Sequence, residues 1–322
     1  MQRYDRAPGS RRFDVTSLGE TMIRFSAGAD ADLASASSLA LHVGGAESNV
    51  CSTLAQLGRR CGWYGRLPNN PLGDRVLAEL MRRGVDTAAV DRPDHERLGL
   101  YFVGGVADRG GRTVVYDRAA SAASNMRSEA APWAYLTNAR VLHLTGITLA
   151  LSASCRQLVR DAIDHAKEAD VAVSFDVNYR RQLWSPEAAC EAMIDVVQRV
   201  DLLICAARDA RHVFGLSGDD EEVSRNLVEL SGARWTVLTL GAAGVIAKSS
   251  TEELHQPALP TRVTDSVGGG DALAAGVIDG YLDGCLRSGL RRGVALAAMA
   301  LEQSGDMPTV SREALERSLA EA

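Results

Sequence analysis

The 322-residue sequence lacks the features that mark several large classes of protein. It has no excess of basic residues, and its net charge of −6 and isoelectric point near 5.6 argue against a nucleic-acid surface. It contains no apolar run of the roughly 18 residues that a membrane-spanning helix needs. The polar, arginine-containing residues 1–12 lack the apolar core of a signal peptide. We therefore expect residues 1–12 to form a flexible tail, and neither nucleic acid nor a membrane to be a partner.

The six cysteines are dispersed, with no C-x-x-C pair, and the six histidines show no zinc-site spacing. Scattered thiols in a chain of this length are typical of a reducing compartment, so we expect a cytoplasmic protein without a disulfide framework. Neither a G-x-x-x-x-G-K-[ST] loop nor a G-x-G-x-x-G turn after a strand is present. Any phosphate group must therefore be bound by another device.

Strand-like and helix-like patterns alternate along most of the chain. This alternation predicts an α/β fold with a doubly wound, mostly parallel sheet flanked by helices, and with sites at the carboxyl ends of strands. Two extended runs at 98–106 and 112–118, separated by D-R-G-G, predict a hairpin inserted as a lid. Because no linker or composition break is visible, we expect one domain over residues 1–322, with a small β-sheet lid from segments at about 20–43 and 98–119.

The most informative stretch is residues 265–276, D-S-V-G-G-G-D-A-L-A-A-G. The consecutive glycines Gly268, Gly269 and Gly270 permit positive φ angles and let backbone N–H groups turn toward a ligand. The alanine-rich segment that follows predicts a helix, whose N-terminus favours an anion. Asp271 would serve as an ordinary helix cap. Beside an anion-binding turn, its carboxylate can also take the proton from a hydroxyl that attacks phosphorus.

This stretch resembles the second signature of the ribokinase-like (PfkB) sugar kinases, D-T-x-G-A-G-D-x-F-x-A-G. The matching residues are Asp265, Gly268, Gly270, Asp271, Ala275 and Gly276. The resemblance implies that the glycine turn is the anion hole, that Asp271 is the catalytic base, and that ATP and Mg²⁺ take part. Residues 44–49, 116–124, 141–149 and 175–180 look like the 2-keto-3-deoxygluconate kinase branch of this family, so the resemblance covers nearly the whole chain.

The resemblance also implies a set of substrate-binding residues. They are Gly45, Asn49, Tyr101, Tyr116, Arg118, Arg180 and Asp306. The first two would contact sugar hydroxyls, and the three from the lid hairpin would reach down onto the sugar. Arg180 would hold either the acid end of the substrate or the phosphate in transfer, two alternatives that the sequence leaves open. Asp306 corresponds to a substrate-side acid. The arginines suit a sugar acid, because a guanidinium matches a carboxylate as a bidentate donor.

On the nucleotide side the chain departs from the family pattern. The residues implied there are Thr239, Gly241, Gly244, Gly268 and Gly270. The usual N-x-x-E becomes Ala206 and Asp209, and the usual K-L-G begins with Thr239. Asp209 would act on Mg²⁺ through water, since this ion keeps several waters and needs few protein ligands. The resemblance also allows a monovalent cation, K⁺, near Asp265.

Together these features predict an ATP-dependent kinase that phosphorylates a primary hydroxyl of a sugar acid, with 2-keto-3-deoxygluconate as the expected substrate. Fructose, another ketose or a nucleoside are alternative substrates. Ala206 and Thr239 leave a different class open, a sugar- or nucleotide-binding regulatory protein that has lost turnover. Because exposed lid strands offer a pairing edge, we also expect a homodimer.

Overall fold

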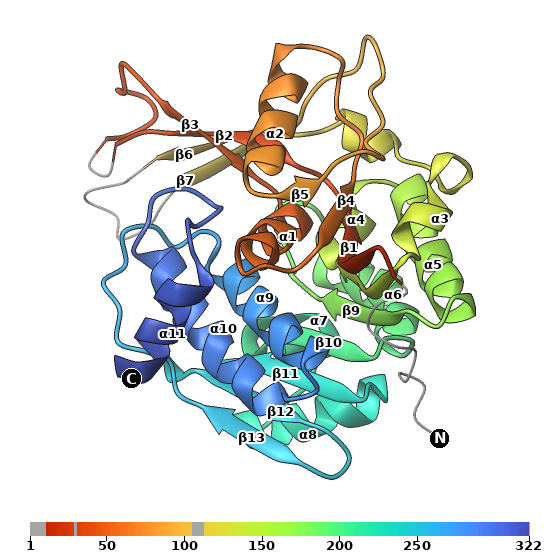
Figure 1. Cartoon of the computed structure of the whole chain (residues 1–322), viewed down its shortest axis with the longest axis vertical. Helices are drawn as coiled ribbons and strands as arrows, with labels where there is room; N and C mark the ends of the chain where they lie inside the picture. The colour runs from red at the N-terminus through yellow and green to blue at the C-terminus, as the bar shows by residue number, and fades with distance from the viewer. Residues whose placement is uncertain (1–10, 29–30, 105–112, 322) are drawn as a thin grey trace.

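The computed structural model describes residues 11–28, 31–104 and 113–321, which form two β-sheets surrounded by helices (Figure 1). The larger sheet contains β1 (Phe13–Leu18), β4 (Cys61–Tyr64), β5 (Val85–Asp86), β8 (Ala139–Thr145), β9 (Ala172–Asp176), β10 (Leu202–Ala206), β11 (Trp235–Thr239), β12 (Val245–Lys248) and β13 (Glu253–Gln256). The smaller sheet contains β2 (Met22–Ser26), β3 (Ala40–Gly44), β6 (Leu100–Gly104) and β7 (Thr113–Asp117).

The α-helices alternate with strands over the middle of the chain, and three helices in succession end it. They are α1 (Ala46–Gln56), α2 (Pro71–Arg82), α3 (Trp133–Leu136), α4 (Gly146–Leu151), α5 (Ala153–Glu168), α6 (Pro186–Val197), α7 (Ala207–Phe214), α8 (Asp220–Ser231), α9 (Gly269–Leu282), α10 (Leu286–Leu301) and α11 (Arg312–Glu321). Short 3₁₀ turns lie at Ala122–Asn125, Ser128–Ala130 and Gly241–Ala243.

The strand order of the large sheet is β13-β12-β11-β10-β9-β8-β1-β4-β5. Neighbouring strands from β5 to β11 run parallel, whereas β12 pairs antiparallel with both β11 and β13. The small sheet has the order β3-β2-β6-β7. The predicted ribokinase-like α/β architecture, with a mostly parallel sheet and a separate small sheet, is confirmed.

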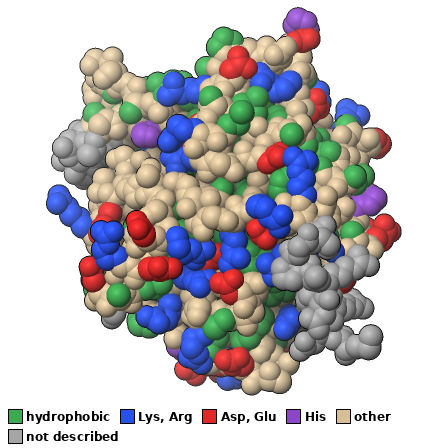
Figure 2. All heavy atoms as spheres, in the orientation of Figure 1, with side chains coloured by type: hydrophobic (Ala, Val, Ile, Leu, Met, Phe, Trp, Pro, Cys, Tyr) green, Lys and Arg blue, Asp and Glu red, His purple; other side chains and the backbone are tan. Residues whose placement is uncertain are grey.

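Helices cover both faces of the large sheet because its buried strands are apolar on both sides. Val141 of β8 belongs to a core shared with α1, α2, α9 and α10, while its neighbour Leu142 belongs to a core shared with α4 to α8. In β10, Ile204 and Cys205 divide between the same two cores. Figure 2 shows acidic and basic side chains interspersed over the surface in view. The buried parallel strands therefore place their carboxyl ends between two helical layers.

The helix α9 is held in a fixed position at the centre of one layer. Asp279 in its third turn is fully buried and accepts hydrogen bonds from Arg59 (2.7 Å), Arg292 (2.6 Å) and Arg312 (2.8 Å). These arginines come from the segment before β4, from α10 and from α11. A buried carboxylate needs such partners, and each one fixes α9 against a neighbouring element. The N-terminus of α9 is positioned by the same packing.

Two helices begin directly after the strand that precedes them. Residues 146–151 form α4, which begins directly after β8 because the Thr145 hydroxyl accepts a hydrogen bond from the Ile147 N–H (3.2 Å). Residues 207–214 form α7 directly after β10, with Gly215 ending it at a φ of 66°. Helices that start immediately after a strand leave little sequence between the two elements in which to recognise a boundary.

The predicted tail, residues 1–12, falls mostly on residues that the structure does not describe. Residues 1–10 lie outside the described residues. Arg11 is fixed: its guanidinium donates to four backbone carbonyls, among them those of Ala139 (2.6 Å) and Ala169 (2.7 Å). These carbonyls lie at the starts of strands β8 and β9, so the side chain of Arg11 packs against the edge of the large sheet at which these two strands begin. The tip of the predicted lid hairpin, at residues 105–112, also lies outside the described residues.

Candidate active site

The glycine turn stands at the N-terminus of α9, as predicted. Gly268 has a φ of 87°, and a Cβ there would lie 2.3 Å from the backbone oxygen of Asp306, so only glycine fits. Gly269 and Gly270 form the first two positions of the helix, whose leading N–H groups have no acceptor within the helix. A Cβ at Gly270 would meet nothing within 4 Å. The turn therefore presents backbone donors toward open space, which suits an anion.

The carboxylate of Asp271 lies in the first turn of α9 and is 8% exposed. The Asn49 amide donates a 2.7 Å hydrogen bond to its Oδ2, and the Asn178 amide donates a 3.4 Å bond to its Oδ1. Burial raises the pKa of Asp271 to about 6, while the bond from Asn49 and the positive charge of Arg180 oppose the rise. A carboxylate with this pKa is ionised near neutral pH and is well matched to accept a proton.

Asn49 connects the predicted substrate loop to this carboxylate. Gly45 caps the N-terminus of α1, and its N–H donates to the Asn49 side-chain oxygen (3.2 Å). A Cβ at Gly45 would lie 2.1 Å from the backbone oxygen of Glu20, so glycine is required there. The structure thus brings Gly45, Asn49 and Asp271 together through two successive hydrogen bonds.

Two further carboxylates lie near the carboxyl ends of β9 and β10. Asp176 ends β9, and burial together with the negative charges of Asp271 and Asp209 raises its pKa to about 8, while Arg180 opposes the rise. Asp209 lies in the first turn of α7, is 3% exposed, and accepts from the Tyr179 N–H at 3.3 Å. Crowded carboxylates at one edge favour a bound cation, and oxygen donors are what Mg²⁺ prefers.

Asp306 and the tyrosines meet on the small sheet. The Tyr101 hydroxyl donates to Asp306, and the ring of Tyr116 stacks on that of Tyr101 with centroids 5.7 Å apart. The carboxylate of Asp306 is 3% exposed and also accepts from the Arg24 guanidinium (3.2 Å). These residues therefore lie together, with Asp306 at the junction between the small sheet and the backbone beneath Gly268.

Arg118 is already paired in this structure. Its guanidinium is 7% exposed and donates to Glu20, with the Nε bond at 2.8 Å, and the Ser121 hydroxyl donates to the other oxygen of the same carboxylate at 2.5 Å. Its guanidinium also lies 5.4 Å from the centre of the Tyr116 ring. The residue is placed beside the predicted sugar-facing tyrosines, but a substrate carboxylate would have to share it with Glu20.

The predicted nucleotide residues form a turn between β11 and β12. Thr239 ends β11 and pairs in register with Ala206 at the end of β10, directly before the helix that carries Asp209. Gly241 and Gly244 have φ angles of 61° and 102°. A Cβ at Gly244 would lie 2.2 Å from the backbone oxygen of Gln256, whereas one at Gly241 would meet nothing within 4 Å. The turn therefore follows the same end of the sheet as the helix that carries Asp209.

Glu47 and Arg24 are buried charged residues near the site that were not recognised in the sequence. Glu47 in α1 is fully buried, accepts from the hydroxyls of Thr145 (2.8 Å) and Thr148 (2.6 Å), and has a pKa that burial raises to about 7. Arg24 is 2% exposed and donates to Asp265 at 2.6 Å. The signal for Arg24 was a single charge within the otherwise apolar run M-I-R-F-S, whereas Glu47 looks like any acidic residue in a first helical turn.

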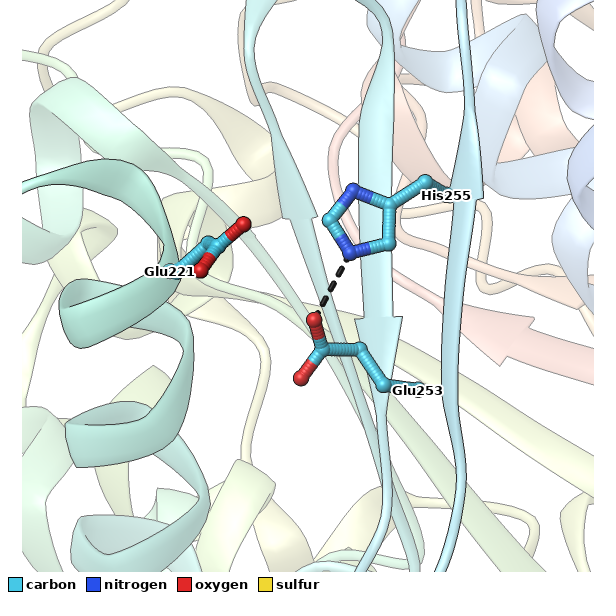
Figure 3. A group of neighbouring side chains, drawn as sticks. All are labelled: Glu221, Glu253 and His255. Carbon is cyan, nitrogen blue, oxygen red and sulfur yellow. Dashed lines mark hydrogen bonds and ion pairs between the residues drawn. The ribbon is translucent and has the colours of Figure 1, made fainter.

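A separate group of possible metal ligands lies on the outer edge of the large sheet. Figure 3 shows Glu253 bonded to His255 (2.7 Å), with Glu221 of α8 facing them. All three side chains are exposed, and the second oxygen of Glu253 pairs with Lys248. The cluster contains none of the predicted site residues, and its carboxylate is satisfied by two cationic or polar neighbours, as in an ordinary surface ion pair.

The two sheets, the glycine turn and the ionisable carboxylate at the start of α9 define a ribokinase-like α/β kinase. A family profile described as pfkB family carbohydrate kinase matches residues 12–312, and the chain belongs to this family of carbohydrate kinases. The resemblance expected from residues 265–276 is thereby confirmed.

Curated relatives agree with this assignment over nearly full length. The chain is 34% identical to a 2-dehydro-3-deoxygalactonokinase of Haloferax volcanii, covering 95% of this chain and 96% of the relative. It is 32% identical to a 2-dehydro-3-deoxygluconokinase of Bacillus subtilis, covering 92% of each. The crystal structure of a 2-dehydro-3-deoxygluconokinase from Thermotoga maritima superposes with a TM-score of 0.90 at 31% identity, covering 96% of this chain and 98% of that one. The predicted similarity to this branch is confirmed, since 2-keto-3-deoxygluconate kinase is another name for the same activity.

Proposed function

We propose that this carbohydrate kinase transfers the γ-phosphoryl group of ATP to a primary hydroxyl of a sugar acid, most favourably 2-keto-3-deoxygluconate. The relatives named for 2-dehydro-3-deoxy sugar acids support this substrate class. The observation that carries the proposal is the placement of Asp271, a nearly buried carboxylate with a pKa of about 6 beside the open N–H groups of the glycine turn.

In the proposed reaction, Asp271 accepts the proton of the sugar hydroxyl as that oxygen attacks the γ-phosphorus. Asn49 holds the carboxylate in place and keeps it ionised through its 2.7 Å bond. The N–H groups of residues 268–270 face the charge that develops on the phosphoryl oxygens. Gly241 and Gly244 would border the nucleotide, while Asp176 and Asp209 would hold Mg²⁺, directly or through water. When bound, this ion supplies positive charge that offsets the phosphate charge.

Arg180 and Arg118 are the residues we propose to recognise the acid group. Arg180 acts on the charges of Asp271 and Asp176, so it lies within electrostatic reach of the phosphoryl-transfer position as well. The two roles proposed for it, binding the sugar carboxylate or the transferred phosphate, remain distinguishable by kinetics. Arg180→Met should raise KM for sugar acids alone in the first case and lower kcat for every acceptor in the second.

The decisive experiment removes the proposed base. Asp271→Ala should lower kcat by about 10²- to 10⁴-fold in a coupled ADP assay with 2-keto-3-deoxygluconate. The variant should also be at least as thermostable as the wild type, because a buried carboxylate with a raised pKa destabilises the fold when ionised. Glu191→Ala, which removes an exposed carboxylate on α6, serves as the control. Wild-type turnover by Asp271→Ala would exclude Asp271 as the base.

The substrate itself is assigned by a panel that includes 2-keto-3-deoxygalactonate, fructose and a nucleoside. The galactonate epimer deserves a place in the panel because of the relative from Haloferax volcanii. Preference for fructose or a nucleoside, with Arg118→Ala equally active on neutral and acidic sugars, would overturn the sugar-acid assignment.

A regulatory binding protein is the second candidate, and the nucleotide side favours it. Ala206 and Thr239 stand in register beside each other, where the family pattern has side chains that organise magnesium and phosphate. Thermal stabilisation by sugar or nucleotide without ADP production, at millimolar Mg²⁺ and across the panel, would decide for this function.

We further propose that residues 1–322 form one kinase unit whose small sheet, with segments 20–43 and 98–119, acts as a lid over the sugar. We propose a homodimer and a cytoplasmic location for it. All six cysteines are free, which suits a reducing compartment, and none of the helices in the described residues is long and apolar enough to cross a membrane. Cell fractionation tests the compartment. A monovalent cation near Asp265 stays a prediction from the resemblance, which the Arg24–Asp265 ion pair opposes.

A further inference from the structure

One row of side chains crosses all four strands of the small sheet. Arg24 of β2 stands opposite His42 of β3 on one side and opposite Tyr101 of β6 on the other, and Tyr101 stands opposite Tyr116 of β7. Residues paired in register point to the same face. Arg24 and Tyr101 of this row both bond to Asp306. The face that carries the row therefore covers the loop that contains Asp306.

Arg24 is the only member of this row with a permanent charge. Its guanidinium, 2% exposed, donates from Nη2 to Asp265 (2.6 Å), from Nη1 to Asp306 (3.2 Å) and from Nε to the Ser26 hydroxyl (2.7 Å). Burial alone would lower the pKa of this guanidinium, but the two carboxylates outweigh the effect and raise it. A buried cation between two buried anions is stable only as a complete set, because removing one member leaves an unpaired charge.

The two carboxylates that Arg24 joins also shape the glycine turn. Asp265 accepts from the Val267 N–H (3.1 Å) and from the Gly305 N–H (3.2 Å), and the backbone oxygen of Asp306 lies directly beneath Gly268. On its other side, the loop at residues 304–307 borders a groove of about 300 Å³ that is also lined by His42 and Arg75. The bonds from Arg24 and Tyr101 therefore hold this loop from the side of the small sheet, while Ser52 and Gln56 of α1 contact Met307 and Pro308.

We infer that Arg24 is a positioning residue that fixes the small sheet to the phosphate-binding turn and supplies, within the chain, the positive charge that a monovalent cation would otherwise supply at Asp265. The donor set supports this inference. Asp265 Oδ2 accepts from Arg24 and Gly305, and Oδ1 accepts from Val267, so each oxygen already accepts from at least one N–H group. A K⁺ ion at this carboxylate would have to displace these donors and would be repelled by the charge of Arg24 2.6 Å away from Oδ2.

Two consequences distinguish this arrangement from a merely structural ion pair. First, turnover should not depend on which monovalent cation is present. Second, weakening the bonds of Arg24 should misplace the turn amides and lower kcat, while KM for ATP changes less, because the amides act on charge that develops in the transition state. The kinetic tests of this inference rest on the proposed kinase reaction. The test of ion binding does not depend on that reaction.

The first test uses the wild-type protein. Rates are measured in K⁺, Na⁺ and choline chloride at equal ionic strength, with the melting temperature followed in the same salts and no substrate. We expect kcat to agree within about twofold and K⁺ to give no stabilisation beyond that of choline. A K⁺ requirement, or stabilisation specific to K⁺, would overturn the inference. The melting temperatures decide this point even if no sugar in the panel is phosphorylated, which by itself would overturn only the proposed function.

The second test uses variants of Arg24 in the full-length protein. Arg24→Met should lower kcat by about 10²-fold. Arg24→Lys keeps the charge but not the forked donors, so its kcat should lie between those of Arg24→Met and the wild type. Methylguanidinium should restore part of the Arg24→Met rate. Arg225→Met, which changes an exposed arginine on α8, is the control. A folded Arg24→Met with wild-type kcat would overturn the positioning role, and if this variant fails to fold, Arg24→Lys and the salt series give the same decision.

Discussion

At the scale of single residues, Asp271 shows how its neighbours tune a general base. Burial alone pushes the pKa of this carboxyl upward, toward the protonated form that cannot accept a proton. The hydrogen bond from Asn49 and the charge of Arg180 favour the ionised form and hold the pKa near 6. The base is thus ionised at neutral pH while keeping more basicity than an exposed aspartate.

Removing the Asn49 bond should therefore move the pH dependence of the reaction. Because only the ionised Asp271 accepts a proton, kcat/KM should rise with pH through the pKa of this group, near 6 in the wild type. Asn49→Leu removes a donor that favours the ionised form, so its acidic limb should lie at higher pH. The measurement is a pH–rate profile of kcat/KM from pH 5 to 8.

Asn178→Gly is the graded comparison for that profile. It removes the longer, 3.4 Å bond to Asp271 and suits the φ of 40° at this position, so its limb should move in the same direction but less. A limb that stays fixed or moves to lower pH in Asn49→Leu would show that another group controls the profile.

At the scale of elements, two glycines at the start of α9 have different roles: Gly268 is required by the backbone geometry, whereas Gly270 leaves open space beside the turn. Gly268→Ala meets a φ of 87° and a backbone oxygen at 2.3 Å, so we expect a loss of stability of about 1–3 kcal/mol together with lost activity. Gly270→Ala adds a methyl group to open space in a helix, which favours stability by up to about 1 kcal/mol. That methyl nevertheless covers the amides that face the phosphate.

Chemical denaturation and steady-state kinetics on the two variants check this contrast. Gly270→Ala should keep or gain stability while its KM for ATP rises. Gly268→Ala should lose both stability and activity. Equal activity of Gly270→Ala and the wild type would show that phosphate does not approach the turn at this position.

The elements that the sequence predicted well were those with a strong local signal. The glycine triplet and the alanine-rich run after it predicted the turn and α9, and apolar runs predicted the parallel strands. The helix α4 and the row on the small sheet could not be predicted in this way. A capping hydroxyl such as Thr145 resembles any threonine, and the register that aligns Arg24 with Tyr101 depends on residues more than 70 positions apart, which no local pattern encodes.

The residues of the site show the same difference between local signals and contacts that only the fold creates. Asp271 lies in a short signature, whereas its partners Asn49 and Asn178 come from α1 and from the segment after β9. Glu47 shows the opposite case, an acidic residue whose surroundings are visible only once Thr145 and Thr148 are brought to it by the fold. Resemblance to a family supplied the positions, and the structure supplies their hydrogen bonds.

At the scale of the whole molecule, the small sheet has a second face that the described residues leave partly uncovered. Leu41, Phe25, Phe102 and Val115 stand opposite one another across the four strands, on the face opposite to that of Arg24. The rings of Phe25 and Phe102 are stacked with centroids 5.2 Å apart, while Leu41 and Val115 at the two edges are 38% and 48% exposed. An apolar row on a sheet with two open edges is a natural pairing surface.

We expect a second copy of the chain to cover this row. Val115→Lys places a charge within the apolar face, and burying an unpaired ammonium is costly, so the variant should dissociate at protein concentrations where the wild type is dimeric. Met81→Lys is the matched control, because Met81 on α2 is 63% exposed and lies on another element. Light scattering after size-exclusion chromatography, at micromolar concentrations, gives the masses. A monomeric wild type would contradict the dimer. A dimer that survives Val115→Lys would place the interface elsewhere, since an interface over this row would bury the new ammonium group without a partner.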